Sequence, residues 1–498
     1  MPDTDFDLIA ATTQAFAPDG PLARADAQFR ARPGQVDMAL AVARTIAAGG
    51  TLVAEAGTGV GKTFAYLVPA LLSGERVLIS TATKALQDQL FTRDLPRLLA
   101  TLGVPLRAAL LKGRASYLCL HRLERAGQGG PGMAHDPQTL RAIAQVQRWA
   151  GSTESGDLAE LPGLDEQSPA VPLVTSTRDN CLGSACAHWA ACHVNRARQR
   201  ALASDVVVVN HHLFFADLAV RESGMAELLP TVRVAVFDEA HQLNATGVQF
   251  LGVQTGTGAL RAYARDVLTA SMANARGMGD WLVLCGNLER AARDMRLAAG
   301  RSTTRRAWLG DVPDGVNAPA WQAAMQQVAD ACRGVVAALG VVREAAPELA
   351  RLYERGVELM QRMARFAAAS APGAVRWLDV GAQLRFVESP LDIAGTVRAK
   401  LLADTGKAWI FTSATLGDDA HLTWFTEPCG LQEAEILRVG SPFDYARQAA
   451  LYVPPDMPEP ASPAHSPAVA ALVARAAARL GGRTLVLTTT LKALQAIG

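Results

Sequence analysis

Lysine, aromatic residues and long apolar runs are all scarce in this chain. Only six of its 48 basic residues are lysine, and Phe, Trp and Tyr together make up 6%. No stretch approaches the roughly 18 uninterrupted apolar residues of a membrane-spanning helix, so we expect no membrane partner. Residues 1–7 are acidic and lack the basic region and apolar run of a secretory signal. These absences predict a cytoplasmic protein.

Neither sign of charge dominates. The 48 basic residues face 47 acidic ones, for a formal net charge of +1, which excludes a globally basic nucleic-acid coat but permits a local basic groove. Half of the residues are hydrophobic, which excludes low-complexity disorder. The seven cysteines are odd in number and unevenly spread, so they favour a reducing compartment and a metal site over a disulfide framework.

Short apolar runs alternate with helical periodicity along much of the chain. Apolar residues between Phe64 and Leu72 recur at i, i+3 and i+4, as in an amphipathic helix. Buried strands are predicted at 51–55, 76–81, 205–209, 232–237, 408–412 and 484–487. Strands that alternate with helices predict βαβ units, a parallel sheet and therefore an α/β fold.

A glycine-rich loop follows the first predicted strand and opens the first helix. It reads Ala56-Gly57-Thr58-Gly59-Val60-Gly61-Lys62-Thr63, the Walker A pattern with Ala in place of the first Gly. Backbone N–H groups of such a loop curl around phosphates, and the helix N-terminus adds partial positive charge. Lys62 is expected to reach the β- and γ-phosphates and Thr63 to bind Mg²⁺. ATP and Mg²⁺ are therefore the expected cofactors.

Two carboxylates, Asp238 and Glu239, follow the strand predicted at 232–237. A strand end delivers them to the carboxyl edge of the sheet, where the glycine-rich loop also lies. Asp238 suits Mg²⁺ coordination, and Glu239 suits the orientation and deprotonation of an attacking water. Alone the pair could be a solvated turn, but beside the loop it predicts a catalytic set of Lys62, Asp238 and Glu239.

Further motifs give the chain a family resemblance. Residues 238–241 read DEAH, residues 412–416 (TSATL) look like helicase motif III, and residues 81–90 look like motif Ia, which touches the nucleic-acid backbone. Residues 32–35 (RPGQ) look like the glutamine motif, in which Gln35 would read adenine. The chain resembles superfamily 2 helicases of the XPD/DinG group, and within it the bacterial YoaA/DinG-like helicases.

The resemblance implies an ATP-dependent DNA helicase with 5′→3′ polarity. Its substrates would be single-stranded DNA and DNA junctions, and its setting would be DNA repair or replication. Replication or repair proteins would be its protein partners.

Four cysteines lie between the glycine-rich loop and the acidic pair: Cys119, Cys181, Cys186 and Cys192. Four thiolates can hold zinc or a [4Fe–4S] cluster, and the wide C-x61-C-x4-C-x5-C spacing disfavours zinc. Residues 112–119 look like the family's approach to its first cluster ligand, so the resemblance implies a [4Fe–4S] cluster. The remaining cysteines are expected to pack as small apolar residues: Cys285, Cys332 and Cys429.

Residues near these cysteines offer a candidate DNA surface. Four arginines could contact phosphates or simply form a solvated face: Arg178, Arg196, Arg198 and Arg200. Tyr117 and Trp189 could stack on bases, although we expect core packing for Trp189. His211 and His212 are expected in a surface loop rather than at a metal, and Asn210 could contact DNA or backbone.

Long separations between the motifs predict insertions into one motor domain. The resemblance implies a RecA-like motor that carries an iron–sulfur domain and a mainly helical Arch-like domain, followed by the start of a second RecA-like domain. We expect the first motor in three parts, at 1–112, 205–244 and 376–440. The iron–sulfur domain is expected at 113–204, the Arch-like insertion at 245–375, and the second motor from 441 to 498.

The family's motifs V and VI are not found in the sequence. Residues 441–444 (SPFD) look like the entrance of the second motor and residues 485–490 like its motif IV. Motif VI supplies the arginine fingers that stabilise the transferring phosphoryl group. We therefore expect a fragment that binds nucleotide but hydrolyses it slowly and unwinds little. Two alternatives stay open: an iron–sulfur or zinc nucleic-acid-binding protein without motor activity, and a zinc-bearing P-loop ATPase that acts on something other than DNA.

Overall fold

The computed structural model describes residues 7–128, 136–222, 228–300, 302–370, 372–403 and 406–498. The chain divides into two compact units, residues 1–442 and residues 443–498, which are described separately. No helix within the described ranges is long and apolar enough to cross a bilayer.

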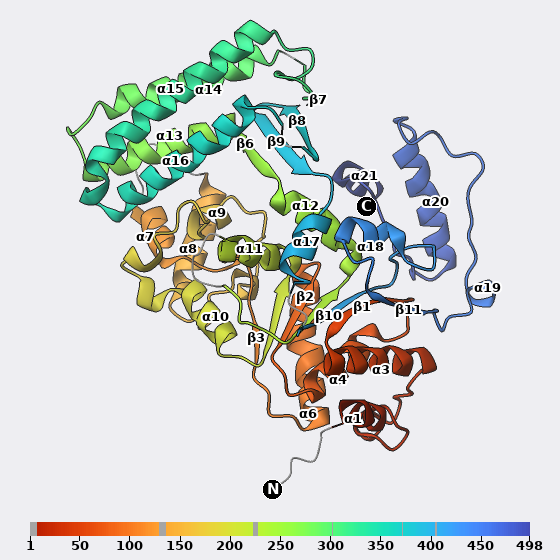
Figure 1. Cartoon of the computed structure of the whole chain (residues 1–498). Coiled ribbons are helices and arrows are strands. Elements are labelled where there is room, and N and C mark those ends of the chain that lie inside the picture. The colour runs from red at the N-terminus through yellow and green to blue at the C-terminus, as the bar shows by residue number, and fades with distance from the viewer. Residues whose placement is uncertain (1–6, 129–135, 223–227, 301, 371, 404–405) are drawn as a thin grey trace. The chain divides into compact units, whose positions relative to one another are not determined.

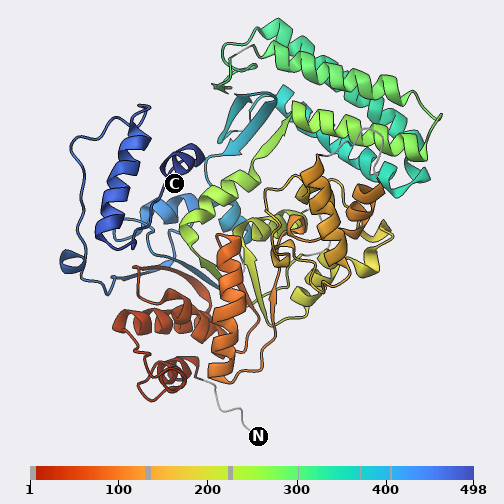
Figure 2. The same cartoon turned by 180° about the vertical axis from the view of Figure 1, so that it is seen from behind.

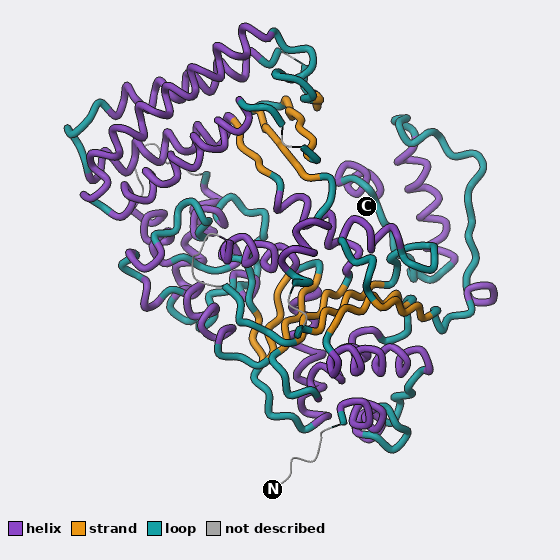
Figure 3. Tube along the Cα trace, in the orientation of Figure 1, coloured by secondary structure: helices purple, strands orange, loops and turns teal. Residues whose placement is uncertain are grey.

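A seven-stranded parallel sheet forms the centre of the first unit, in the order β11-β1-β10-β5-β2-β4-β3 (Figures 1 and 3). This confirms the predicted α/β class. Five predicted strands are present, and the short β3 and β11 extend the sheet at its two edges. The strands are β1 (Gly50–Ala56), β2 (Val77–Thr81), β3 (Ala108–Leu110), β4 (Val206–Asn210), β5 (Val234–Asp238), β10 (Ala408–Ser413) and β11 (Glu435–Val439).

Helices cover both faces of this sheet, as parallel strands that are apolar on both sides require. Leu52 and Ala54 of β1 pack on one face, while Val53 packs on the other. The first face carries α1 (Leu8–Ala15), α2 (Pro21–Ala25), α3 (Pro33–Ala48), α4 (Lys62–Leu72) and α6 (Leu95–Leu102). The second carries α10 (His193–Leu202), α11 (His211–Glu222), α12 (Leu243–Leu251), α17 (Ala394–Lys400) and α18 (Thr423–Cys429).

The cysteine-bearing segment has a small apolar core of its own. Leu118, Leu123, Ile143, Val146 and Val174 are all buried in it. The helices around it are α7 (Leu120–Gln128), α8 (Pro137–Ala150) and α9 (Val171–Val174), and short 3-10 turns follow at Gly183–Ala185 and Trp189–Ala191. This core is separate from the cores on the two faces of the parallel sheet.

Four long helices dominate the region expected to be helical, as predicted. They are α13 (Thr257–Asn274), α14 (Trp281–Ala298), α15 (Ala318–Val342) and α16 (Pro347–Ala367) (Figure 2). The sequence interpretation missed an antiparallel sheet here, in the order β6-β9-β8-β7. Its strands are β6 (Val253–Gly256), β7 (Arg305–Ala307), β8 (Ala374–Val380) and β9 (Leu384–Pro390).

This antiparallel sheet shares a core with the four helices. Trp308, Trp321, Phe366 and Phe386 contact one another with ring centroids 5.6–5.9 Å apart. Residues 376–390, which the sequence analysis gave to the motor, therefore pack with the helices instead. Their alternation of buried and less buried positions is that of strands with one covered face.

The second unit contains three helices in its described residues: α19 (Tyr445–Gln448), α20 (His465–Arg479) and α21 (Leu491–Ile497). The strand predicted at 484–487 is wrong, because these residues form no strand, and Leu485 and Leu487 are exposed. A strand needs a neighbour to satisfy its backbone, and no strand is described between 443 and 498.

Candidate functional site

The glycine-rich loop runs from the end of β1 into α4, as predicted. Ala56 is the last residue of β1 and Lys62 the first of α4. Gly59 and Gly61 have φ angles of 88° and 92°, a left-handed region that disfavours any residue with a Cβ. A Cβ on Gly61 would also lie 2.3 Å from Gln35 Nε2. The glycines at these two positions are therefore required by geometry.

The residues of the predicted glutamine motif lie against this loop. Gln35 is buried in α3, and its Nε2 donates to the Gly61 carbonyl over 3.1 Å. The Arg32 guanidinium donates to the Gly59 carbonyl. Residues from before β1 thus support the loop from one side, which brings together two motifs that sequence analysis identified separately.

The two carboxylates lie at the carboxyl edge of the same sheet. Ala54, Thr412 and Asp238 are in register across the adjacent strands β1, β10 and β5. Burial first, and then the neighbouring Glu239 carboxylate, raises the pKa of Asp238 to about 6, although the Tyr66 hydroxyl and Lys62 act in the opposite direction. A divalent cation would favour the charged form of this carboxylate.

Tyr66 is a functional residue that the sequence analysis missed. It lies one helical turn after Lys62, is fully buried, and its hydroxyl donates to Asp238 Oδ2 over 3.2 Å. Burial first, and then Asp238, raises the pKa of the Tyr66 phenol well above its ordinary value, so the hydroxyl remains a donor. A phenol on an otherwise apolar helix face was the signal available in the sequence.

Glu239 is held by motif III rather than by its own strand. Its φ of 53° lies in the left-handed region, which is uncommon for a residue with a side chain and often marks functional sites. Ser413 Oγ donates to Glu239 Oε2 over 3.2 Å, and His241 Nδ1 lies 2.8 Å from the same hydroxyl. His241 Nδ1 is also 3.3 Å from Glu239 Oε2. The DEAH box and motif III therefore form one hydrogen-bonded cluster.

The four predicted metal ligands are all half-buried thiols. Burial raises the pKa of Cys119, and the charges of Cys181, Cys192 and Cys186 raise it further, so these three thiols lie within electrostatic range of Cys119. In the described ranges, no three Cys, His, Asp or Glu side chains gather closely enough to hold a metal ion. A single zinc needs each sulfur about 2.3 Å from one centre, whereas a four-iron cluster binds its thiolates on separate irons.

Two expectations about aromatic residues are wrong. Tyr117 is buried, and its hydroxyl accepts a hydrogen bond from the Lys112 backbone N–H over 3.1 Å, so it cannot stack on a base. Trp189, expected in a core, has 37% of its surface exposed. Trp189 lies in a three-residue 3-10 turn between Cys186 and Cys192, and none of the residues of this turn is buried.

Of the three polar residues at the end of β4 and the start of α11, one differs from expectation. His211 is fully buried rather than in a surface loop, because β4 runs directly into α11. Its Nδ1 lies 2.7 Å from Ser80 Oγ, and burial lowers its pKa to about 4. Asn210 contacts backbone, since its Oδ1 accepts from the Leu213 N–H over 2.8 Å. His212 is exposed.

Among the candidate DNA-contacting arginines, Arg178, Arg196 and Arg200 are exposed. Arg198 is half-buried near Cys181 and Cys192, and burial lowers its pKa. The exposed three remain available to phosphates.

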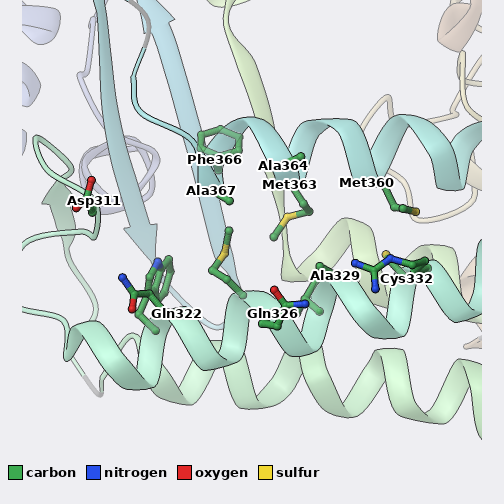
Figure 4. A pocket seen from close by; sticks show the side chains of 14 residues that line it. Asp311, Gln322, Gln326, Ala329, Cys332, Met360, Met363, Ala364, Phe366 and Ala367 are labelled. Carbon is green, nitrogen blue, oxygen red and sulfur yellow. The ribbon is translucent and has the colours of Figure 1, made fainter.

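A cavity of about 380 Å³ lies away from these residues, between α15 and α16 (Figure 4). Apolar side chains dominate its lining, among them Trp321, Met325, Met360, Met363 and Phe366. None of the predicted site residues lines it.

Comparison with known proteins identifies the family. The DEAD/DEAH box helicase family matches residues 37–126. The chain is 39% identical over 482 residues to the ATP-dependent DNA helicase YoaA of Escherichia coli (strain K12), a match that covers 96% of this chain and 74% of that protein. The chain belongs to the YoaA/DinG family of ATP-dependent DNA helicases.

A second relative supports the same assignment. The YoaA helicase of Haemophilus influenzae is 37% identical over 445 residues, which cover 89% of this chain and 68% of that protein. Among solved structures, S. tokodaii Xpd4 is 13% identical with a TM-score of 0.47, over 94% of this chain and 73% of that one. The predicted family and ATP-dependent helicase activity are confirmed by the YoaA matches.

Proposed function

We propose that this helicase hydrolyses ATP at the carboxyl edge of the parallel sheet and uses the energy to move along single-stranded DNA with 5′→3′ polarity. The observation that carries the proposal is the cluster in which Ser413 of motif III joins Glu239 and His241. Motif III couples hydrolysis to strand movement in the family that the chain resembles. Because Glu239 is hydrogen-bonded to motif III, a change at Glu239 during hydrolysis would move that motif.

The proposed ATP site uses main chain and side chains in distinct roles. The N–H groups of residues 56–61 cradle the phosphates, with Lys62 against the β- and γ-phosphates. Thr63 and Asp238 hold Mg²⁺, and Glu239 orients and deprotonates the attacking water. Gln35 contacts the adenine, and its bond to Gly61 joins base recognition to the phosphate loop.

We infer that Cys119, Cys181, Cys186 and Cys192 hold a [4Fe–4S] cluster. Support comes from four half-buried thiols in one segment, three of which raise the pKa of the fourth, Cys119. When bound, such a cluster would cross-link residues 119–192, whose apolar core is small. Iron and sulfide assays on anaerobically purified protein test this: about four of each per chain is expected, and stoichiometric zinc without iron would contradict it.

The separate cores support the proposed insertion of two domains into the first motor. We place the end of the Arch-like insertion near residue 390 rather than 375, because β8 and β9 pair there. The cytoplasmic location, the role in repair or replication and the partner proteins stay predictions.

Tailed duplexes test the polarity. Unwinding of a 5′-tailed duplex but not of a 3′-tailed one is expected. Preference for a 3′ tail would contradict the proposed polarity.

A further inference from the structure

A carboxylate directly before the phosphate loop joins two other segments of the motor. Glu55, the residue before Ala56, has a side chain that is 14% exposed. Its Oε2 accepts hydrogen bonds from the backbone N–H groups of Leu416 (2.7 Å), the last residue of motif III, and of Gly417 (3.1 Å), the residue after it. Its Oε1 accepts from Arg438 Nη2 (2.9 Å) and Nε (3.1 Å). One side chain thus uses both oxygens to hold motif III and β11.

The phosphate loop is bonded to the same stretch of chain a second time. The Gly57 N–H donates to the Val439 carbonyl over 2.9 Å, and Ser441 Oγ donates to the Thr58 carbonyl over 2.7 Å. The approach is close, since a Cβ on Gly57 would lie 2.7 Å from the Ser441 nitrogen. A loop that shifts around a nucleotide must therefore carry residues 439–441 with it.

We propose that Glu55 and Arg438 are positioning residues that transmit nucleotide occupancy of the phosphate loop to Leu416 and Gly417 at the end of motif III. The proposal deepens the proposed ATP site and rests on it. Arg438 lies between the two sets of contacts: its own strand continues into Val439, and its guanidinium grips Glu55. Movement of residues 439–441 would shift Arg438 and therefore the position of the Glu55 carboxylate. This shift would change the hydrogen bonds that the carboxylate accepts from the N–H groups of Leu416 and Gly417.

An ion pair with no such role would behave differently. The Arg438 side chain is 41% exposed, and ion pairs this accessible contribute little to stability. Loss of the pair should therefore leave folding nearly unchanged. If Arg438→Gln remains stably folded but residues 416 and 417 no longer respond to nucleotide, the ion pair acts in coupling and not only in stability.

Hydrogen–deuterium exchange offers a readout that needs no turnover. We would compare amide exchange in peptides that contain residues 416 and 417, with and without a non-hydrolysable ATP analogue and Mg²⁺. In the wild type, the nucleotide should change exchange there by about tenfold, within the usual range of coupling between sites. In Arg438→Gln the change should fall below about threefold, while nucleotide affinity stays within about threefold of wild type.

The opposite edge of the same sheet provides a matched control. Arg107 precedes β3 and pairs with Asp205 at 3.4 Å, so Arg107→Gln removes a comparable ion pair far from the loop. This variant should keep the wild-type response. Arg438→Lys should restore only part of the response, because lysine keeps the charge but lacks the two-pronged geometry.

The outcomes separate the coupling from the ATP site itself. A full nucleotide response in Arg438→Gln, or an equal loss in Arg107→Gln, would overturn the coupling while the ATP site stands. Absence of nucleotide binding by the wild type, or unchanged binding in Lys62→Ala, would overturn the ATP site and the coupling with it. Glu55→Gln breaks the same ion pair from its other side, so it controls for a local folding effect of Arg438→Gln. If the proposal is right, Glu55→Gln should also lose the nucleotide-dependent change in exchange at residues 416 and 417.

Discussion

Asp238→Asn should stabilise the nucleotide-free protein above pH 6. Burial, followed by the Glu239 charge, raises the pKa of this carboxyl from 3.8 to about 6. A group whose pKa is raised by folding binds protons more tightly in the folded state. Its favourable contribution is therefore complete below about pH 4 and is lost as pH rises through 6. At pH 8 the folded protein holds a charged carboxylate in a buried site.

The size of this effect follows from the pKa. Each pKa unit corresponds to about 1.4 kcal/mol, so a shift from 3.8 to about 6 corresponds to roughly 3 kcal/mol. Asparagine removes the charge and keeps an oxygen that can accept the Glu239 N–H, now donated to Asp238 Oδ1 over 3.0 Å. We expect Asp238→Asn to raise the free energy of unfolding by about 1–3 kcal/mol at pH 8 and by little at pH 4.

Urea unfolding without nucleotide or Mg²⁺ at several pH values measures this difference. Asp205→Asn is the matched control, because hydrogen bonds from Arg107 lower the pKa of Asp205. A lowered pKa contributes stability above about pH 4, so this control should destabilise the protein at pH 8. If Asp238→Asn destabilised the protein at pH 8 as Asp205→Asn does, the reasoning about the buried charge would be refuted.

Three further predictions concern other parts of the molecule. Ser413→Ala removes the hydroxyl that is bonded to Glu239 and His241. At about 1 kcal/mol per bond, ATP turnover should fall about fivefold to thirtyfold with little change in the KM for ATP. An effect on KM alone would contradict the proposed role of this cluster. Lys112→Met leaves the Asp157 carboxylate, which is 11% exposed, without the ammonium group that now lies 2.7 Å away. We expect the free energy of unfolding measured in urea to fall by about 3 kcal/mol. An unchanged unfolding midpoint would disprove the role of this ion pair. Cys186→Ser should lower iron content and visible absorbance together, whereas equal iron in both proteins would argue against its role as a ligand.

Local sequence patterns were enough to predict the ATP-site motifs and the sheet that carries them. The loop at 56–63 and the carboxylates at 238 and 239 each follow an apolar strand, and parallel strands bring their carboxyl ends to one edge. Their environment was not predictable in the same way. Tyr66, Glu55 and Arg438 act through contacts between segments up to 383 positions apart, which depend on strand order and register.

The errors share a physical origin in tertiary context. Tyr117 and Trp189 are both aromatic, and only the packing around them decides which is buried. His211 follows an apolar strand as a loop residue would, but the chain turns at once into α11 and buries it against Ser80. The strands β8 and β9 were missed because the sequence was divided by its motifs, and these strands carry none.

Hydrolysis of ATP by the purified protein, with and without single-stranded DNA, tests the central claim most directly when wild type, Lys62→Ala and Glu239→Gln are compared. The account predicts that Lys62→Ala weakens nucleotide binding, whereas Glu239→Gln still binds nucleotide but loses at least about 100-fold in turnover, the lower range for loss of a general base. Undiminished hydrolysis in Glu239→Gln would contradict the account.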